Sequence, residues 1–173
     1  GLLAKLYKWR RKPAYREALE RSIGFILDEL KGQDGGFYAS LDAEADGEEG
    51  GTYTWTHQEI REVLGQDCHW FCEYYNVSVN GNWQGSNVLY TNEEITDFAR
   101  RKGVQAGAVR AYLHTAKERL LKERRARVQP KPDKKIILGW NALLLSALVE
   151  AFEATHNAEY LTEAKGLKAY LEN

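Results

Sequence analysis

The chain has 173 residues, of which 43% are hydrophobic and 28% charged, values typical of one globular domain. Its formal net charge of −1 gives no electrostatic argument for a nucleic-acid or membrane-surface partner. No apolar run approaches the ~20 residues that cross a bilayer. Residues 2–9 are too short, and too interrupted by Lys5 and Lys8, for a signal peptide. We therefore expect no nucleic-acid partner and no membrane association.

The first long helix is expected between Pro13 and Lys31, where apolar residues recur on one face and charged residues occupy the other. Proline is tolerated in the first helical turn. Gly32, Gly35 and Gly36 then end the helix.

Two short stretches rich in aromatic residues and threonine, at 37–40 and 52–55, are typical of strands. They flank an acidic, glycine-rich loop, so we expect them to pair as a small antiparallel ribbon inserted between helices. Short helices are expected at 56–64, 67–75 and 92–102.

Two cysteines, Cys68 and Cys72, lie one helical turn apart beside His69 in the second of these short helices. Two cysteines are too few for a disulfide framework. A structural zinc site needs four ligands, and the sequence offers no second Cys or His cluster. We therefore expect two buried thiols and no metal or other cofactor. Reduced thiols favour a cytoplasmic protein.

Three longer helices are expected at 105–124, 138–155 and 158–171. The helix at 138–155 is apolar on nearly every side, which predicts a buried helix. The last helix carries only one narrow apolar stripe, so it should lie outside, with its charged face in water.

A weak internal repeat relates residues 12–18 to residues 157–164, because each copy follows a turn with Ala, an aromatic residue and a further Ala. A buried helix precedes the second copy, and residues 2–10 resemble the end of a similar inner helix. Alternating inner and outer helices build an (α/α) toroid. We expect a mainly α fold in which residues 1–173 form a single incomplete toroid with a small β-ribbon. The absence of methionine also suggests a fragment or a processed product.

The most unusual segment is acidic: five carboxylates, including Asp42, Glu44 and Asp46, occur within eight residues. Crowding of this kind raises some carboxyl pKa values and prepares a general acid. The spacing also imitates the start of an EF-hand loop. The twelfth loop position is Tyr53 rather than a bidentate Glu, so we do not expect a calcium site. The plainer interpretation is a solvated acidic turn.

Aromatic residues around these carboxylates, Tyr53 and Trp55 among them, favour a pocket in which a sugar stacks on flat rings. A second polar segment places Asp133 just ahead of the apolar helix that carries Trp140 and Asn141 in its first turn. An Asn at such a position needs a hydrogen-bond partner. Either Asn141 bonds a neighbouring loop, or Trp140 and Asn141 line the central cavity of the toroid.

Four segments carry a resemblance to a known family. They are Gly35-Gly36-Phe37-Tyr38 with Leu41-Asp42-Ala43 and Gly47-Glu48-Glu49-Gly50, Tyr53-Thr54-Trp55-Thr56 with Glu59-Ile60, Gly81-Asn82 with Gly85-Ser86-Asn87-Val88-Leu89, and Pro130, Asp133 and Lys135 with Trp140-Asn141. Through them the chain resembles the spermatogenesis-associated protein 20-like family, in which a thioredoxin-like domain precedes a six-hairpin glycosidase-like toroid.

The resemblance implies a fold similar to that of N-acylglucosamine 2-epimerases, and it implies carbohydrate metabolism. It also implies two partners within a longer parent chain, the remaining toroid and the thioredoxin-like domain. The chain departs from the family pattern at Lys134, where a second Asp is usual, and at Ala142, where Gly is usual.

Two functional hypotheses follow. In the first, the chain is part of a glycosidase-like or sugar epimerase-like protein, with acid–base groups at Asp42, Glu44, Asp46 and Asp133 and substrate-binding groups at Tyr53, Trp55, Trp140 and Asn141. In the second, the chain is a non-catalytic helical scaffold that binds a protein partner or a sugar. A pair of carboxylates at glycosidase spacing would favour the first.

Overall fold

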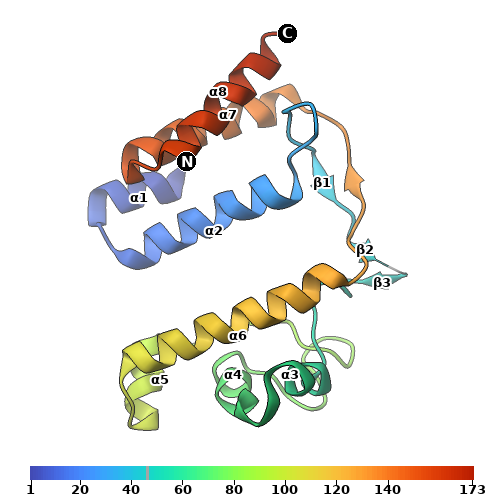
Figure 1. Ribbon diagram of the computed structural model, residues 1–173, viewed down its shortest axis with the longest axis vertical. Helices are drawn as coiled ribbons and strands as arrows, with labels where there is room; N and C mark the ends of the chain where they lie inside the picture. Colours follow the sequence, from blue (N-terminus) through green and yellow to red (C-terminus); the bar gives the residue numbers. More distant parts are fainter. Residues whose placement is uncertain (46) are drawn as a thin grey trace. The chain divides into compact units, whose positions relative to one another are not determined.

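The computed structural model describes residues 1–45 and 47–173. These residues form two compact units (Figure 1). Unit 1 comprises Gly1–Asp42 and Lys131–Asn173, and unit 2 comprises Ala43–Pro130. The expectation of a mainly α fold with a small ribbon is confirmed. No helix of the described residues is both long enough and apolar enough to cross a membrane.

Unit 1 is built from two helical hairpins whose first helices pack against each other (Figure 1). Its elements are α1 (Leu2–Arg10), α2 (Pro13–Glu29), β1 (Ser40–Leu41), β4 (Pro132–Asp133), α7 (Leu138–Thr155) and α8 (Ala158–Leu171). In the core of the unit, α7 runs along α8 and contacts α1, so inner and outer helices alternate as the repeat predicts.

Both hairpins turn through the same backbone conformation. Arg11 and His156 end α1 and α7 in the left-handed region, at φ values of 53° and 57°, and each amide bonds a carbonyl four residues earlier. The next residues, Lys12 and Asn157, are extended, and α2 and α8 begin directly after them. The internal sequence repeat therefore has a structural counterpart.

The outer helix α8 docks as predicted, with Tyr160, Ala164 and Leu167 all buried. The prediction that α7 is buried on every side is wrong for the described chain. Leu148 is fully buried, but Leu143 is 72% exposed. The apolar pattern covers both faces of α7, whereas α1, α2 and α8 cover only one of them.

Unit 2 contains α3 (His57–Leu64), the 3₁₀ turn η1 (Gly65–Asp67), α4 (Cys68–Tyr74), α5 (Ile95–Lys102), α6 (Ala106–Ala126), β2 (Glu44–Ala45) and β3 (Glu48–Glu49). The helices predicted in this region are all present. The buried stripe of α6 packs against α3 and α5, and Phe71 and Phe98 fill the centre of the core.

Both cysteines of unit 2 are buried and unbonded, as predicted. Burial, with a smaller contribution from the adjacent Cys68, raises the pKa of the Cys72 thiol to about 12. A thiol with so high a pKa stays protonated at neutral pH and is a poor nucleophile.

The predicted pairing of residues 37–40 with 52–55 is wrong. Instead, β1 pairs antiparallel with β4, and β2 pairs with β3 to form the small ribbon. Trp55 forms an isolated bridge with Asn87. Each stretch pairs instead with a segment later in the chain. The Asn141 side chain bonds the backbone of Phe37, and the Asn87 side chain bonds the backbone of Trp55.

The uneven burial of α7 predicts a contrast between two leucines five residues apart. Leu148→Ala should lower the free energy of unfolding by ~2–5 kcal/mol, because a fully buried side chain leaves a cavity. Leu143→Ala should change it by less than about 0.5 kcal/mol, because its side chain lies in water. Chemical denaturation of both variants measures the difference, and equal losses would contradict the assigned orientation of α7.

Candidate functional site

Asn141 organises the part of unit 1 where most of the predicted site residues lie. Its side chain is 2% exposed, and its Oδ1 accepts a hydrogen bond from the Phe37 amide at 2.8 Å. Its Nδ2 donates to the carbonyls of Phe37 at 3.0 Å and Ile137 at 3.1 Å. The first of the two alternatives for Asn141 is therefore observed, since it bonds a neighbouring segment through both polar atoms of its amide.

Trp140 projects from the same helical turn and is 57% exposed. Trp140 and Asn141 line a small hollow of about 170 Å³ together with Tyr38, Ala39 and Leu144. An exposed indole beside a second aromatic ring offers a flat apolar surface with a polar edge. The carboxylates Asp42 and Asp133 do not line this hollow.

The short β1–β4 ladder places Asp42 and Asp133 on one face. Ser40 lies opposite Asp133, and the Asp42 amide donates to the Lys131 carbonyl at 2.8 Å. Asp42 is the first residue after β1, and if the side chains continue to alternate, it falls on the same face as Ser40 and diagonal to Asp133. Diagonal positions of such a ladder are typically about 7–8 Å apart.

The Asp133 carboxylate is held by Lys135, whose Nζ lies 3.0 Å from Oδ2 and whose amide donates to Oδ1 at 3.2 Å. The side-chain hydrogen bond, followed by the backbone one, lowers the pKa of Asp133 below its ordinary value. The contacts with Lys135 favour the charged form of Asp133, which suits a general base or a charge-stabilising group.

The remaining predicted residues belong to unit 2, apart from Asp46, which lies outside the described residues. Glu44 is exposed on β2, and Tyr53 is 39% exposed. Trp55 is only 4% exposed, and the Arg127 guanidinium lies 3.8 Å from the centre of its ring. The face of Trp55 that was expected to stack on a sugar is thus occupied by Arg127.

Arg127 was missed by the sequence reasoning, yet it organises the loop at 51–54. Its Nη1 donates to the carbonyls of Gly51 at 3.1 Å and Thr54 at 2.7 Å, and its Nη2 donates to Glu59 at 2.8 Å. Glu59 also completes a capping box with Thr56 at the start of α3. The pattern of Thr followed three residues later by Glu is a known signal for such a box, and it marks Glu59 in the sequence.

Asn87 plays in unit 2 the role of Asn141 in unit 1. It is fully buried, and its Oδ1 accepts from the Ser78 amide at 2.9 Å. Its Nδ2 donates to the carbonyls of Trp55 and Ser78, both at 3.1 Å. Asn87 therefore fixes the loop that carries Trp55 and Thr56.

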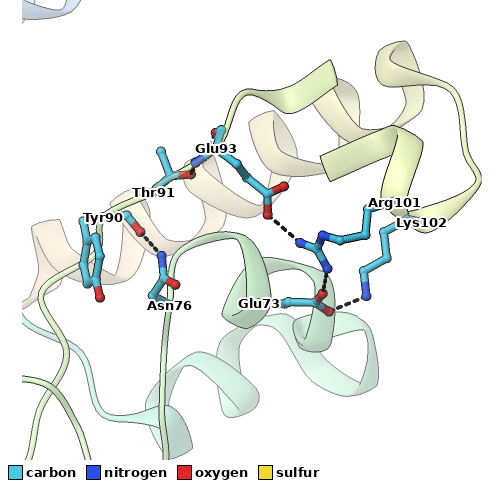
Figure 2. A network of polar contacts seen from close by, with 7 residues as sticks. All are labelled: Glu73, Asn76, Tyr90, Thr91, Glu93, Arg101 and Lys102. Carbon is cyan, nitrogen blue, oxygen red and sulfur yellow. Dashed lines mark hydrogen bonds and ion pairs between the residues drawn. The ribbon is translucent and has the colours of Figure 1, made fainter. Parts of the chain in front are cut away.

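A network of ion pairs joins α4 to α5 and the segment before it (Figure 2). Glu73 accepts hydrogen bonds from Lys102 and Arg101, which lower the pKa of its carboxyl group, and Arg101 also bonds Glu93. Asn76 nearby donates to the Tyr90 carbonyl at 3.0 Å. Each charge of this network meets an opposite charge, so we assign it a structural role.

Within the described part of the chain, no group of three or more His, Cys, Asp or Glu side chains is placed to hold a metal ion.

The ion pair at Asp133 leads to a titration prediction. In the folded chain, the carboxyl pKa of Asp133 should lie below the ordinary value of about 3.9. Lys135→Gln should raise it towards that value, because both the charge and the side-chain donor are lost. Any stabilisation from the pair is present above the unfolded pKa and is lost as pH falls through the lowered folded value. Carboxyl NMR measures the titration. Lys134→Gln is the matched control, and an equal response to both changes would refute the assignment.

No family model matches the chain. The chain is 27% identical over 168 residues to spermatogenesis-associated protein 20 of Rattus norvegicus, an alignment that covers 82% of the chain and 21% of that protein. It is 27% identical to the protein of the same name from Homo sapiens, covering 76% of the chain and 20% of that protein. An uncharacterized protein of Caenorhabditis elegans is 28% identical, with 80% and 22% covered. The chain thus spans about a fifth of the length of these relatives. The resemblance to the spermatogenesis-associated protein 20 family is therefore confirmed over most of the chain.

Proposed function

We propose that the chain is part of a carbohydrate-binding helical toroid and that unit 1 carries the sugar-binding face. The observation that supports this proposal best is the exposed ring of Trp140 beside Tyr38, at the start of a helix that Asn141 holds in place. Aromatic faces stack on the apolar side of a pyranose ring, and polar groups around them bond its hydroxyls.

The carboxylate pair of the β1–β4 ladder extends this face. Asn141 bonds Phe37, and Ser40, three residues further on, lies opposite Asp133. Asp42 and Asp133 therefore follow directly along the segment that Asn141 holds. Carboxylates accept hydrogen bonds from sugar hydroxyls without repelling a neutral ligand.

Glycoside hydrolysis is the reaction that a pair of neighbouring carboxylates supports best. Diagonal positions of a ladder are about 7–8 Å apart at the backbone. The distance between the two carboxyl groups, which distinguishes inverting from retaining glycosidases, depends also on the side-chain torsions. Asp133, whose carboxyl pKa is lowered by Lys135, suits the general base, and Asp42 is the second carboxylate of the pair. This reaction, and the activity of the longer parent protein, are part of the proposal.

A specific observation favours the scaffold as a second candidate function. Leu138 and Leu143 on α7 are 66% and 72% exposed, and exposed apolar residues gathered on one helix are typical of protein-binding surfaces. A partner that covers α7 would need these leucines, whereas a sugar at the Trp140 hollow would not.

Isothermal titration of the chain with a panel of neutral mono- and disaccharides tests the sugar-binding face. Trp140→Ala should weaken binding by about tenfold, because the stacking surface is lost. Asp133→Asn should weaken it less, because an amide still accepts one hydrogen bond. Trp9→Ala, which removes an indole that is 71% exposed on α1, is the matched control and should bind as the unchanged chain does.

Two results would contradict the proposal: no heat from any sugar, or equal weakening by Trp140→Ala and Trp9→Ala. The double change of Leu138 and Leu143 to Glu should leave sugar binding intact. Loss of binding in that variant would instead favour the apolar surface of α7 as the functional one.

A further inference from the structure

A second hollow lies wholly within unit 2, beside the guanidinium of Arg127. Its volume is about 430 Å³, within the range of about 300–1,000 Å³ that is typical of small-molecule sites. Its lining is rich in hydroxyl groups, and the polar side chains that surround it are Thr52, Thr54, Thr56, Ser86, Glu59 and Arg127.

Hydrogen bonds of Arg127 and Asn87 hold the walls of this hollow. Arg127 bonds three carbonyls of the loop at 51–54 and rests on the buried ring of Trp55. The side-chain amide of Asn87 donates a hydrogen bond to the Trp55 carbonyl. A site whose walls are already ordered loses little conformational entropy when a ligand binds.

The hydroxyl groups in the hollow fall into two pairs. Thr52 donates to the Val128 carbonyl at 2.8 Å, and Thr56 donates to Glu59 at 2.8 Å, so both are used by the protein. For the residues that the structure describes, it shows no protein hydrogen bond from the hydroxyls of Thr54 and Ser86. These two groups can each donate one bond and accept two.

The charges of Glu59 and Arg127 at the wall of the hollow favour a neutral ligand over an anion. Glu59 binds Arg127 at 2.8 Å and places a carboxylate at the wall of the hollow, so an added anion would meet both an already neutralised cation and a like charge. A neutral group that both donates and accepts fits all the walls. Adjacent hydroxyls can donate to the Glu59 carboxylate and accept from an Arg127 N–H group that the loop carbonyls leave over.

We propose that this hollow is a binding site for a small neutral polyol, a sugar or a sugar alcohol, with Thr54 and Ser86 as its free hydrogen-bonding groups. The site belongs to unit 2 alone and does not depend on the sugar-binding face of unit 1. Arg127 and Glu59 hold the loop at 51–54 in place and contact the ligand. The ring of Trp55 packs against the guanidinium of Arg127.

The test titrates the chain with D-glucose, D-mannitol and inorganic phosphate while recording amide and arginine Nε–Hε resonances by NMR. The neutral polyols should shift the resonances of Thr54, Ser86 and Arg127 in a saturable manner. Thr54→Val and Ser86→Ala should each weaken that binding by about three- to tenfold, because each removes one neutral hydrogen bond. Arg127 itself is left unchanged, because its loss would disorder the loop.

Thr162→Val is the matched control, since it removes an exposed threonine hydroxyl of α8 in unit 1. Trp140→Ala should leave the unit 2 shifts unchanged, which separates this site from the face of unit 1. The proposal is overturned if neither polyol shifts these resonances, if phosphate alone shifts them, or if both hydroxyl variants bind as tightly as the control.

Discussion

Two buried asparagine side chains hold together segments that are distant in the sequence. Asn141 joins the start of α7 to Phe37, and Asn87 joins the segments around Trp55 and Ser78. In each case one side-chain amide accepts a hydrogen bond from a backbone N–H group and donates to backbone carbonyls. These backbone groups belong to irregular segments and are not paired within a regular sheet. A buried backbone group left without a partner costs about 1–3 kcal/mol, so the asparagines make these irregular segments stable enough to carry functional groups.

The functional proposals depend on this support. Without the Asn141 bonds, the segment that leads into β1 loses its side-chain attachment to the first turn of α7, where Trp140 lies. Without the Asn87 side chain, the segment at Trp55, which Arg127 also contacts, loses its side-chain link to Ser78. The hollow beside Trp140 and the hollow beside Arg127 are thus both lined by loops that a buried asparagine holds in place. Functional groups are commonly carried by loops that a rigid scaffold positions.

The helices were predicted well because the residue pattern that specifies a helix lies within one continuous segment of the sequence. The stripe of α8, the turn after α1 and the buried positions of α6 all follow from residue spacing within one segment. The strands were predicted in composition but paired wrongly, since pairing depends on side chains such as Asn141 about a hundred residues away. The burial of α7 was overestimated, because an apolar pattern does not say which of its faces the neighbouring helices cover.

The candidate site was predicted unevenly for the same reason. Sequence motifs drew attention to Trp140 and Asn141, and a single polar residue in an apolar helix correctly indicated a hydrogen-bond partner. The aromatic and acidic residues around Trp55 predict a platform on which a sugar stacks. The true neighbour of Trp55 is Arg127, more than seventy residues later, which spacing alone does not identify. Long-range contacts of this kind determine whether an aromatic ring is available to a ligand.

Hydrogen exchange at two backbone amides tests the central claim about the asparagines most directly. Asn141→Ala should increase the exchange rate of the Phe37 amide by about tenfold or more, because that amide loses its acceptor, while the Ser78 amide keeps its protection. Asn87→Ala should do the reverse, and Asn92→Ala, at an exposed position, should affect neither. Unchanged protection of Phe37 in Asn141→Ala, or of Ser78 in Asn87→Ala, would contradict the account.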